Sequence, residues 1–343
     1  MKMCNALSSN NDVTLLTRGK KNSESDFSYY GVNKTFKIKK FNFLNIRILS
    51  SLFFSFFSFF QIIKIKPQII FTRNRFSLLV CLLFKKNKII FEDHSPPTGF
   101  YRYLINYMLK KKLTKIVLIS NELKKIYSKS CPNIDHCNVI VAHDGADPMK
   151  IKDIESQIIN FKNNKINCGY IGHLYKGRGI NTIINLSNEI RDISFHIVGG
   201  NESDINYWKS KTKNNNIFFH GYFENKFIPP LINQFDILLA PYQEKVFLQN
   251  NLNTVKWMSP LKIFEYMSSG KPIISSNLLV LREVLVNEKN AFLVEPGNII
   301  EWSEALHRLK KDKALRSKIG NQAKRDFLSK YTWAKRAQLI IES

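Results

Sequence analysis

The stretch Ser259–Ile274, SPLKIFEYMSSGKPII, predicts a turn, a helix, an abrupt stop and a buried strand. Ser259 is a favourable N-cap, and Pro260 suits the first helical position because its missing N–H costs nothing there. Gly270 ends the helix, Pro272 prevents its return, and two isoleucines then begin a short strand. The start of such a helix offers free backbone N–H groups and a positive dipole end, which together suit a phosphate group.

Composition and charge limit the class of protein. The 343 residues are enough for two α/β domains, and 44% hydrophobic residues indicate a folded chain. Five scattered cysteines, without a CxxC pair or a Cys/His cluster, predict free thiols and no zinc site. Residues 1–150 carry 25 Lys+Arg against 9 Asp+Glu, which suits an anionic lipid surface but also a generally lysine-rich composition. No nucleic-acid recognition module accompanies the charge, so a nucleic-acid partner is not expected.

Strand-like and helical patterns alternate along the chain and predict parallel sheets with helices on both faces. A polar break near 150–166 predicts two Rossmann-like domains facing a cleft: residues 1–149, residues 150–325, and a C-terminal helix over 326–343 that packs back toward the first domain. Strands are expected at Val13–Leu16, Gln68–Phe71, Lys88–Phe91, Ile116–Ile119, Val139–Val141, Asn167–Ile171, Phe195–Val198, Ile217–Phe219, Ile237–Leu239, Pro272–Ser275 and Ala291–Val294. Helices are expected at 178–190, 203–213, 225–234, 260–269, 278–286 and 300–310.

The segment Ile46–Ile63, IRILSSLFFSFFSFFQII, is apolar on all sides and has about the minimum length for a membrane span. A span would separate segments that both look like parts of one sheet, which argues against it. A buried domain helix is one alternative. A helix lying in a membrane interface, flanked by lysines, is the other, and both stay open.

Glycine-rich turns follow two strands of the second half. Gly172-His173-Leu174-Tyr175-Lys176-Gly177-Arg178-Gly179 comes after the first strand, and Gly199-Gly200 comes after the next. Glycines let a ligand approach the backbone, and the two cations favour phosphate. The alternative is that these are only tight turns between a strand and a helix.

Residues 167–335 resemble the C-terminal domain of the family 4 (group 1) glycosyltransferases, which have the two-domain GT-B architecture. The N-terminal half resembles the same family less strongly. The matching motifs are GHLYKGRGI, HIVGG, FFHGYF, FDILLAPY, SPLKIFEYMSSGKPII, LLVLREVL, NAFLVEPGN and YTWAKRA in the second half, and VTLLTR, KPQIIFTRN, IIFEDHSP, IVLISNELKKIY and VIVAHDGAD in the first.

The resemblance implies an α/β GT-B protein that transfers a sugar with retention of anomeric configuration from a nucleotide-diphosphate sugar, without a metal or another cofactor. It implies catalytic roles for His94, Arg178 and Lys262, of which His94 faces the transferred sugar and Arg178 contacts the diphosphate. Glu265 is implied to bind the donor ribose. The other donor-binding residues implied are Gly172, His173, Lys176, Gly199, Gly200, Pro260 and Leu261.

Two departures from the family pattern bear on activity. Trp257 stands where the family often has a glutamate, and His173 stands at a second cation position. An insertion containing Lys245, Asn250, Asn251 and Asn253 precedes the helix. The chain also starts at the end of the family's first helix, so its first strand and glycine-rich acceptor loop are expected to be missing. Such a chain is expected to be less stable and less active than one extended at its N-terminus.

The implied acceptor is a growing surface glycan or glycolipid, as in lipopolysaccharide and polysaccharide biosynthesis. The basic N-terminal half and the Phe-rich segment suggest a cytoplasmic location with peripheral contact to the inner face of the membrane. Two other readings remain: a nucleotide-sugar epimerase of the same architecture, and a non-catalytic remnant that binds a nucleotide sugar.

Overall fold

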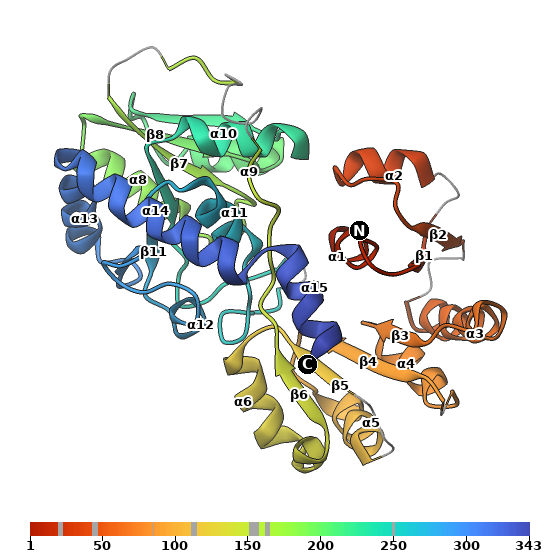
Figure 1. Ribbon diagram of the computed structural model, residues 1–343. Helices are drawn as coiled ribbons and strands as arrows, with labels where there is room; N and C mark the ends of the chain where they lie inside the picture. Colours follow the sequence, from red (N-terminus) through yellow and green to blue (C-terminus); the bar gives the residue numbers. More distant parts are fainter. Residues whose placement is uncertain are drawn as a thin grey trace. The chain divides into compact units, whose positions relative to one another are not determined.

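The chain forms two compact units. A computed structural model describes residues 1–19, 23–42, 47–84, 86–110, 115–150, 158–161, 165–248 and 251–343 (Figure 1). Met1–His143 and Arg336–Ser343 make up the first unit, and Asp144–Lys335 make up the second. The boundaries expected at residues 149 and 325 both fall inside the second unit.

The first unit contains a two-stranded sheet, ordered β1-β2, and a four-stranded sheet, ordered β3-β4-β5-β6, all with parallel pairing. The central strands β4 and β5 are almost wholly buried. The sequence does not reveal β2, KIKKF, because its lysines hide the apolar alternation, as is common in edge strands. The elements are α1 (Lys2–Leu7), β1 (Thr14–Arg18), α2 (Ser23–Tyr29), β2 (Lys37–Phe41), α3 (Arg47–Ile65), β3 (Ile69–Thr72), α4 (Arg75–Cys81), β4 (Lys88–Asp93), α5 (Gly99–Lys110), β5 (Lys115–Leu118), α6 (Asn121–Ser130), η1 (Pro132–His136) and β6 (Asn138–Val141).

The second unit is built on a six-stranded parallel sheet ordered β12-β11-β10-β7-β8-β9. Every strand expected in this half is present within a few residues of its predicted ends. The segment 326–343 is not one helix, since α14 ends at Lys330 and α15 begins at Trp333. The elements are β7 (Ile166–Ile171), α8 (Ile180–Glu189), β8 (Ile193–Val198), α9 (Glu202–Lys209), β9 (Ile217–Gly221), η2 (Asn225–Phe227), α10 (Ile228–Gln234), β10 (Ile237–Ala240), α11 (Leu261–Ser269), β11 (Ile273–Ser276), α12 (Leu279–Arg282), β12 (Phe292–Val294), α13 (Ile299–Lys311), α14 (Lys313–Lys330) and α15 (Trp333–Glu342).

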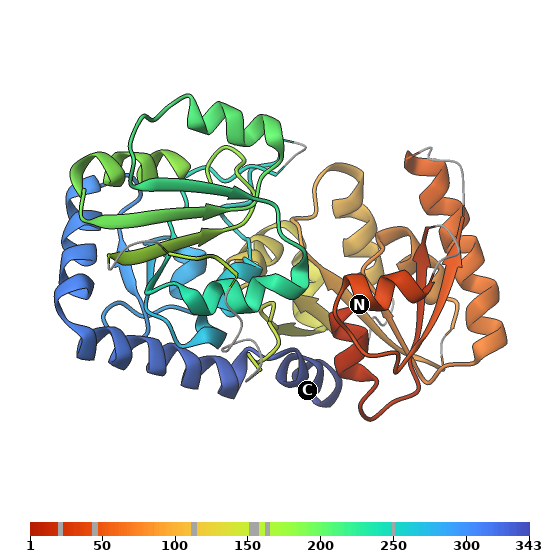
Figure 2. The same ribbon diagram turned by 90° about the horizontal axis from the view of Figure 1, so that it is seen from above.

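Helices cover both faces of this sheet and bury two separate apolar cores (Figures 1 and 2). Successive strand residues point to opposite faces, so Leu238 joins one core while Ile237 and Leu239 join the other. Helices α10, α11 and α14 pack on the first face, and α8, α9 and α13 pack on the second. Burial on both faces explains why these strands read as continuous apolar runs in the sequence.

The Phe-rich segment forms α3, a helix with one exposed side. All six of its phenylalanines are exposed or only half-buried, which rules out the buried-helix alternative. Within the part of the chain that the structure describes, no helix has the length and apolarity needed to cross a membrane. The five cysteines are free thiols, as the sequence predicts.

Candidate functional site

Helix α11 begins at the carboxyl-end side of the second unit's sheet without a side-chain cap. Its N-cap position is Pro260, and helical residues begin at Leu261. The expected N-cap, Ser259, is wrong, because its Oγ instead accepts a hydrogen bond from the Asp144 backbone N–H over 2.9 Å. The expected C-cap is confirmed: Gly270 has a left-handed backbone with φ of 75°. The first turn of α11 therefore keeps backbone N–H groups that no side chain of its N-cap satisfies.

The predicted glycines let three loops of this sheet come into close contact. Gly172 follows β7, and a Cβ there would lie 2.8 Å from Lys262 Nζ. Gly199 follows β8, and a Cβ there would lie 2.2 Å from the Gly172 carbonyl oxygen. A Cβ at Gly200 would lie 2.5 Å from Leu174 Cδ1. These positions need glycine for packing, and the packing brings the strand ends together beside α11.

Two buried nitrogens of basic side chains lie in this region without a hydrogen-bond partner among the described residues. They are Lys262 Nζ and Arg178 Nε. Lys262 Nζ lies 3.8 Å from the centroid of the Tyr170 ring. Arg178 Cζ lies 5.6 Å from the centroid of the Tyr242 ring, and Lys262 Nζ lies 5.3 Å from the same centroid. Aromatic faces offer a cation partial compensation but no hydrogen bond, so the two nitrogens keep their capacity to bind an anion.

The electrostatics of this cluster also favour an anion. Burial, and then the charge of Arg178, lower the pKa of Lys262 well below its usual value, and Glu265 opposes the shift. Glu265 stands one helical turn from Lys262 on α11, so both side chains lie on one face of the helix. Burial, followed by the charges of Arg178 and Lys262, also lowers the pKa of His173. An incoming anion would favour the protonated form of Lys262.

The insertion after β10 packs against the glycine-rich turn, a contact that the sequence does not predict. The Gln243 N–H donates to the Gly177 carbonyl over 2.9 Å, and the Phe247 N–H donates to the Lys176 carbonyl over 3.3 Å. A Cβ at Gly177 would lie 1.9 Å from the Lys245 carbonyl oxygen, so the two backbones touch. Asn250 lies outside the described residues. In the sequence this turn is marked by Gly177 and Gly179, which have positive φ values in the structure. These glycines predict a tight turn, but they do not predict which segment packs against it.

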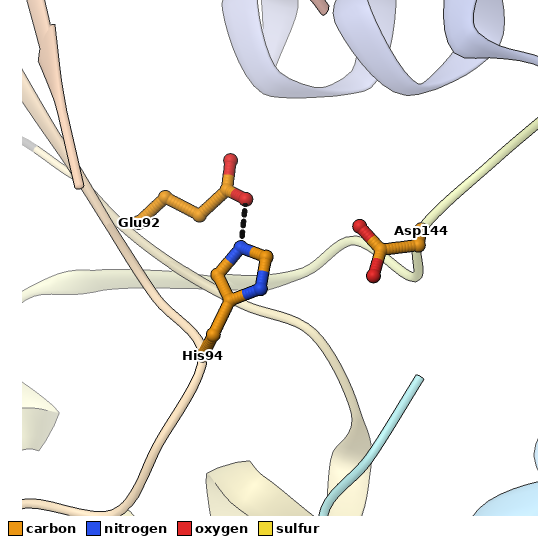
Figure 3. Close-up of side chains that lie close together, drawn as sticks. All are labelled: Glu92, His94 and Asp144. Atoms are coloured by element: carbon orange, nitrogen blue, oxygen red, sulfur yellow. Dashed lines mark hydrogen bonds and ion pairs between the residues drawn. The ribbon is translucent and has the colours of Figure 1, made fainter. Parts of the chain in front are cut away.

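His94 lies in the first unit, directly after β4. Its Nε2 faces the buried carboxylate of Glu92 at hydrogen-bond distance (Figure 3). Arg336 also binds this carboxylate, with Nη1 3.1 Å from Oε2 and Nη2 3.0 Å from Oε1, and Arg73 Nη2 lies 2.9 Å from Oε1. Burial alone would raise the pKa of Glu92, but the His94 hydrogen bond and the charges of Arg336 and Arg73 hold it at about 2. Glu92 is therefore an ionised anchor that orients the His94 ring.

A pocket of about 440 Å³ lies beside His94 within the first unit. Asp93, one of its lining residues, is bound by Arg75 through Nη2 at 2.7 Å and Nε at 3.0 Å. His94 and Arg73 keep 39% and 47% of their side chains exposed, and so present polar groups to the pocket. The lining residues are Ser51, Arg73, Asn74, Arg75, Phe76, Glu92, Asp93, His94, Ser95 and Tyr101.

Residues 165–312 match the family model described as glycosyl transferases group 1. This match covers less than half of the chain and assigns these residues of the second unit to the group 1 glycosyltransferases. An uncharacterized glycosyltransferase of Methanocaldococcus jannaschii is 25% identical over 300 residues, which cover 79% of this chain and 73% of the relative. The UDP-Gal:alpha-D-GlcNAc-diphosphoundecaprenol alpha-1,3-galactosyltransferase of Escherichia coli is 26% identical over 223 residues, covering 60% of this chain and 53% of that protein. This chain thus spans about half the length of the second relative.

The fold of the chain agrees with this match. The crystal structure of Anabaena Alr3699/HepE in complex with UDP and glucose is similar with a TM-score of 0.72 and 13% identity, covering 99% of this chain and 94% of that one. At this identity the likeness shows the fold, which is GT-B, as the sequence resemblance predicts. Every expected donor-binding residue lies within the matched range 165–312, whereas His94 lies in the first unit, outside it.

Proposed function

We propose that this glycosyltransferase moves a sugar, with retention of anomeric configuration, from a nucleotide-diphosphate sugar to a surface-glycan or lipid-linked acceptor of polysaccharide or lipopolysaccharide synthesis. The observation that carries the donor assignment is the pair of buried nitrogens, Lys262 Nζ and Arg178 Nε, that lack hydrogen-bond partners among the described residues. Together with the uncapped start of α11 they offer positive charge and N–H groups to a diphosphate. A structurally similar protein was crystallised with UDP and glucose, which supports this donor class.

Transfer needs a way to stabilise the leaving diphosphate. In the proposed reaction the acceptor hydroxyl oxygen bonds to the anomeric carbon while the bond to the diphosphate oxygen breaks. The hydroxyl proton passes to the departing oxygen, so attack and departure occur on the same face of the sugar. Arg178, Lys262 and the α11 N-terminus meet the charge that develops on the diphosphate, without a metal or a further cofactor. Lys176, in the same turn as Arg178, adds a further positive charge.

Two further residues have proposed roles in binding. Glu265, on the same face of α11 as Lys262, accepts hydrogen bonds from the donor ribose. His94, held by ionised Glu92, hydrogen-bonds the transferred sugar. Gly172, His173, Gly199, Gly200, Pro260 and Leu261 provide the backbone walls of the donor site.

The acceptor side of the proposal rests on the relatives and on the surface charge. The name of the Escherichia coli relative describes an acceptor sugar carried on diphosphoundecaprenol. We extend that class, a glycan on a membrane lipid, to this chain, because its first 150 residues carry 25 Lys+Arg against 9 Asp+Glu. The proposed location is the inner face of the cytoplasmic membrane, with peripheral contact.

The donor assignment is tested by calorimetric titration with UDP, GDP and ADP and by thermal-shift measurements with UDP-, GDP- and ADP-sugars. One nucleotide is expected to bind the wild-type protein, with at least a tenfold loss in Arg178→Ala and Glu265→Ala and with no loss in Lys256→Ala, an exposed lysine of the neighbouring loop. Unchanged binding in both site variants would refute the assignment.

Catalysis is tested by incubating the protein with the bound donor and lipid extracts. Transfer to a lipid-soluble product, with the same anomeric configuration as the donor, is the expected result, and His94→Ala is expected to slow it at least about tenfold. Conversion of the donor to its epimer without acceptor, or an inverted product, would contradict the proposal.

A further inference from the structure

The exposed side of α3 has the opposite polarity to that of an ordinary surface helix. Its buried positions include three serines, Ser50, Ser55 and Ser58, with exposures of 7%, 3% and 5%. Five large apolar side chains instead point outward, with exposures between 48% and 63%. We call them the apolar face of α3: Leu52, Phe53, Phe56, Phe60 and Ile63.

The fold itself satisfies the buried serines, so this arrangement is stable as built. Ser55 Oγ donates to the Ser51 carbonyl and Ser58 Oγ donates to the Phe54 carbonyl, each over 2.8 Å. Ser55 Oγ also lies 3.3 Å from Ser77 Oγ on α4, so small side chains let the two helices approach closely. The inner side of α3 also holds Ile62, which is buried, and the half-buried Phe54, Phe57 and Phe59. The helix is therefore apolar on its exposed side as well as on its packed side.

The apolar face is continuous along the helix. At 100° per residue its five members fall within one stripe about 100° wide, and Lys64 stands at the edge of that stripe. The rings of Phe56 and Phe60 meet edge to face at 4.8 Å, so the exposed aromatics pack on each other along the surface. A contiguous exposed apolar stripe of this kind is typical of an interaction surface.

The excess of basic residues in the chain around α3 favours an anionic partner for this face. From Lys34 to Lys115 the chain has 17 Lys+Arg and two acidic residues, Glu92 and Asp93, which are both buried and paired with arginines. Of these cations Lys115 is buried, and Lys37 and Lys40 pair with Asp12 and Asp26 from the preceding segment, so the excess is smaller than the count but still positive. A second copy of the chain, docked symmetrically, would bring the same positive stretch onto itself. An anionic lipid surface attracts the lysines and takes the phenylalanines into its interface.

We infer that the apolar face of α3 inserts into the interface of an anionic bilayer, with Lys64 and Lys66 at the lipid headgroups. The helix lies in the plane of the membrane and holds the first unit against it. The inference rests on the proposed function for the identity of the acceptor. It adds the surface that brings the enzyme to a lipid-linked acceptor.

The test is co-sedimentation of the full-length protein with vesicles. Wild-type protein is expected to pellet with vesicles of equal parts phosphatidylglycerol and phosphatidylcholine, and much less with phosphatidylcholine alone or at high salt. The triple variant Phe53→Ser/Phe56→Ser/Phe60→Ser is expected to lose at least about tenfold in partitioning, because three aromatic rings leave the interface. Lys64→Glu/Lys66→Glu is expected to remove the preference for anionic lipid.

The matched control replaces three exposed apolar residues of the second unit, Tyr207, Ile300 and Leu328, by serine, and is expected to pellet like the wild type. Equal sedimentation of the Phe and control variants would overturn the inference, as would failure of the wild type to bind anionic vesicles. A dimer in sedimentation velocity without lipid, dissolved by the Phe substitutions, would also overturn it in favour of a second copy. Nucleotide titration without vesicles tests the donor site separately, so either proposal can fail while the other stands.

Discussion

Arg336 and Glu92, which stand 244 positions apart in the chain, form a bidentate ion pair inside the first unit. Arg336 is 2% exposed and Glu92 is fully buried. The Arg336 Nε also donates to the His143 carbonyl over 2.8 Å, and its Nη2 donates to the Ala142 carbonyl over 3.2 Å. The last residues of the chain thereby fix the carboxylate that orients His94.

Glu92→Gln is expected to destabilise the first unit by about 3 kcal/mol, because it leaves the buried charge of Arg336 without its counter-charge. All four tryptophans lie in the second unit, so far-UV circular dichroism in urea should show an earlier transition while tryptophan fluorescence stays unchanged. The control is Glu288→Gln at the exposed Arg308–Glu288 pair, where a loss below about 1 kcal/mol is expected. Equal losses in the two variants would contradict the account.

The same carboxylate predicts an acid dependence of stability. The pKa of Glu92 is lowered to about 2 in the folded protein from 4.5, so its contribution is complete above about pH 4.5 and is lost as the pH falls toward 2. The loss should amount to about 3 kcal/mol. Urea unfolding between pH 2 and 6 checks this, and Glu92→Gln should flatten the slope. An unchanged slope in the variant would count against the assigned pKa.

Lys262→Met is expected to stabilise the ligand-free protein by about 1 kcal/mol, because it removes a buried amine whose Nζ has no hydrogen-bond partner in the described structure. The lowered pKa of Lys262 means that wild-type stability rises with pH between that pKa and 10.5, and the variant should lack this rise. The same variant should bind the nucleotide diphosphate at least tenfold more weakly.

Thermal denaturation and calorimetric titration check both halves of that prediction. Lys256→Met removes an exposed lysine near the same helix and should change neither quantity. A Lys262→Met protein that loses stability, or that binds the nucleotide as tightly as the wild type, would show that the buried Lys262 side chain is structural.

Gly179→Ala is expected to destabilise the second unit by about 3 kcal/mol. The residue has a φ of 84°, and a Cβ would lie 1.7 Å from the Pro241 carbonyl oxygen. Gly99→Ala is the control, since it has a φ of 52° with nothing within 4 Å of its Cβ, and about 1 kcal/mol is expected. Tryptophan fluorescence in urea should shift for Gly179→Ala alone. Similar losses in the two variants would mean that the backbone contact is not tight.

The sequence predicts most of the second unit because its signals are local. Apolar runs mark strands buried on both faces, and Gly270 marks the helix stop that the structure confirms. The secondary structure of the first unit is harder to predict from the sequence. The strand Lys37–Phe41 carries three lysines, and the pattern of the Phe-rich segment does not separate a buried helix from an interfacial one until its neighbours are known.

The candidate site divides in the same way. Motifs in a fixed order identify the family and locate Arg178, Lys262, Glu265 and His94, but they do not show that Lys262 Nζ and Arg178 Nε are buried without hydrogen bonds. Capping preference suggests that Ser259 is the N-cap of the helix, which is wrong, because its hydroxyl accepts a hydrogen bond from the backbone N–H of Asp144, 115 positions away. A serine before a helix favours capping, but here a backbone N–H far away in the chain donates to its oxygen instead.

By itself, then, the sequence determined the α/β class, the order of the second unit's strands along the chain and the family, because periodicity, caps and glycines act over a few residues. Only the tertiary structure decided which face of α3 is exposed, where the insertion after β10 packs, and that Arg336 holds Glu92. These relationships depend on burial and on partners far away in the chain, and no local pattern encodes them.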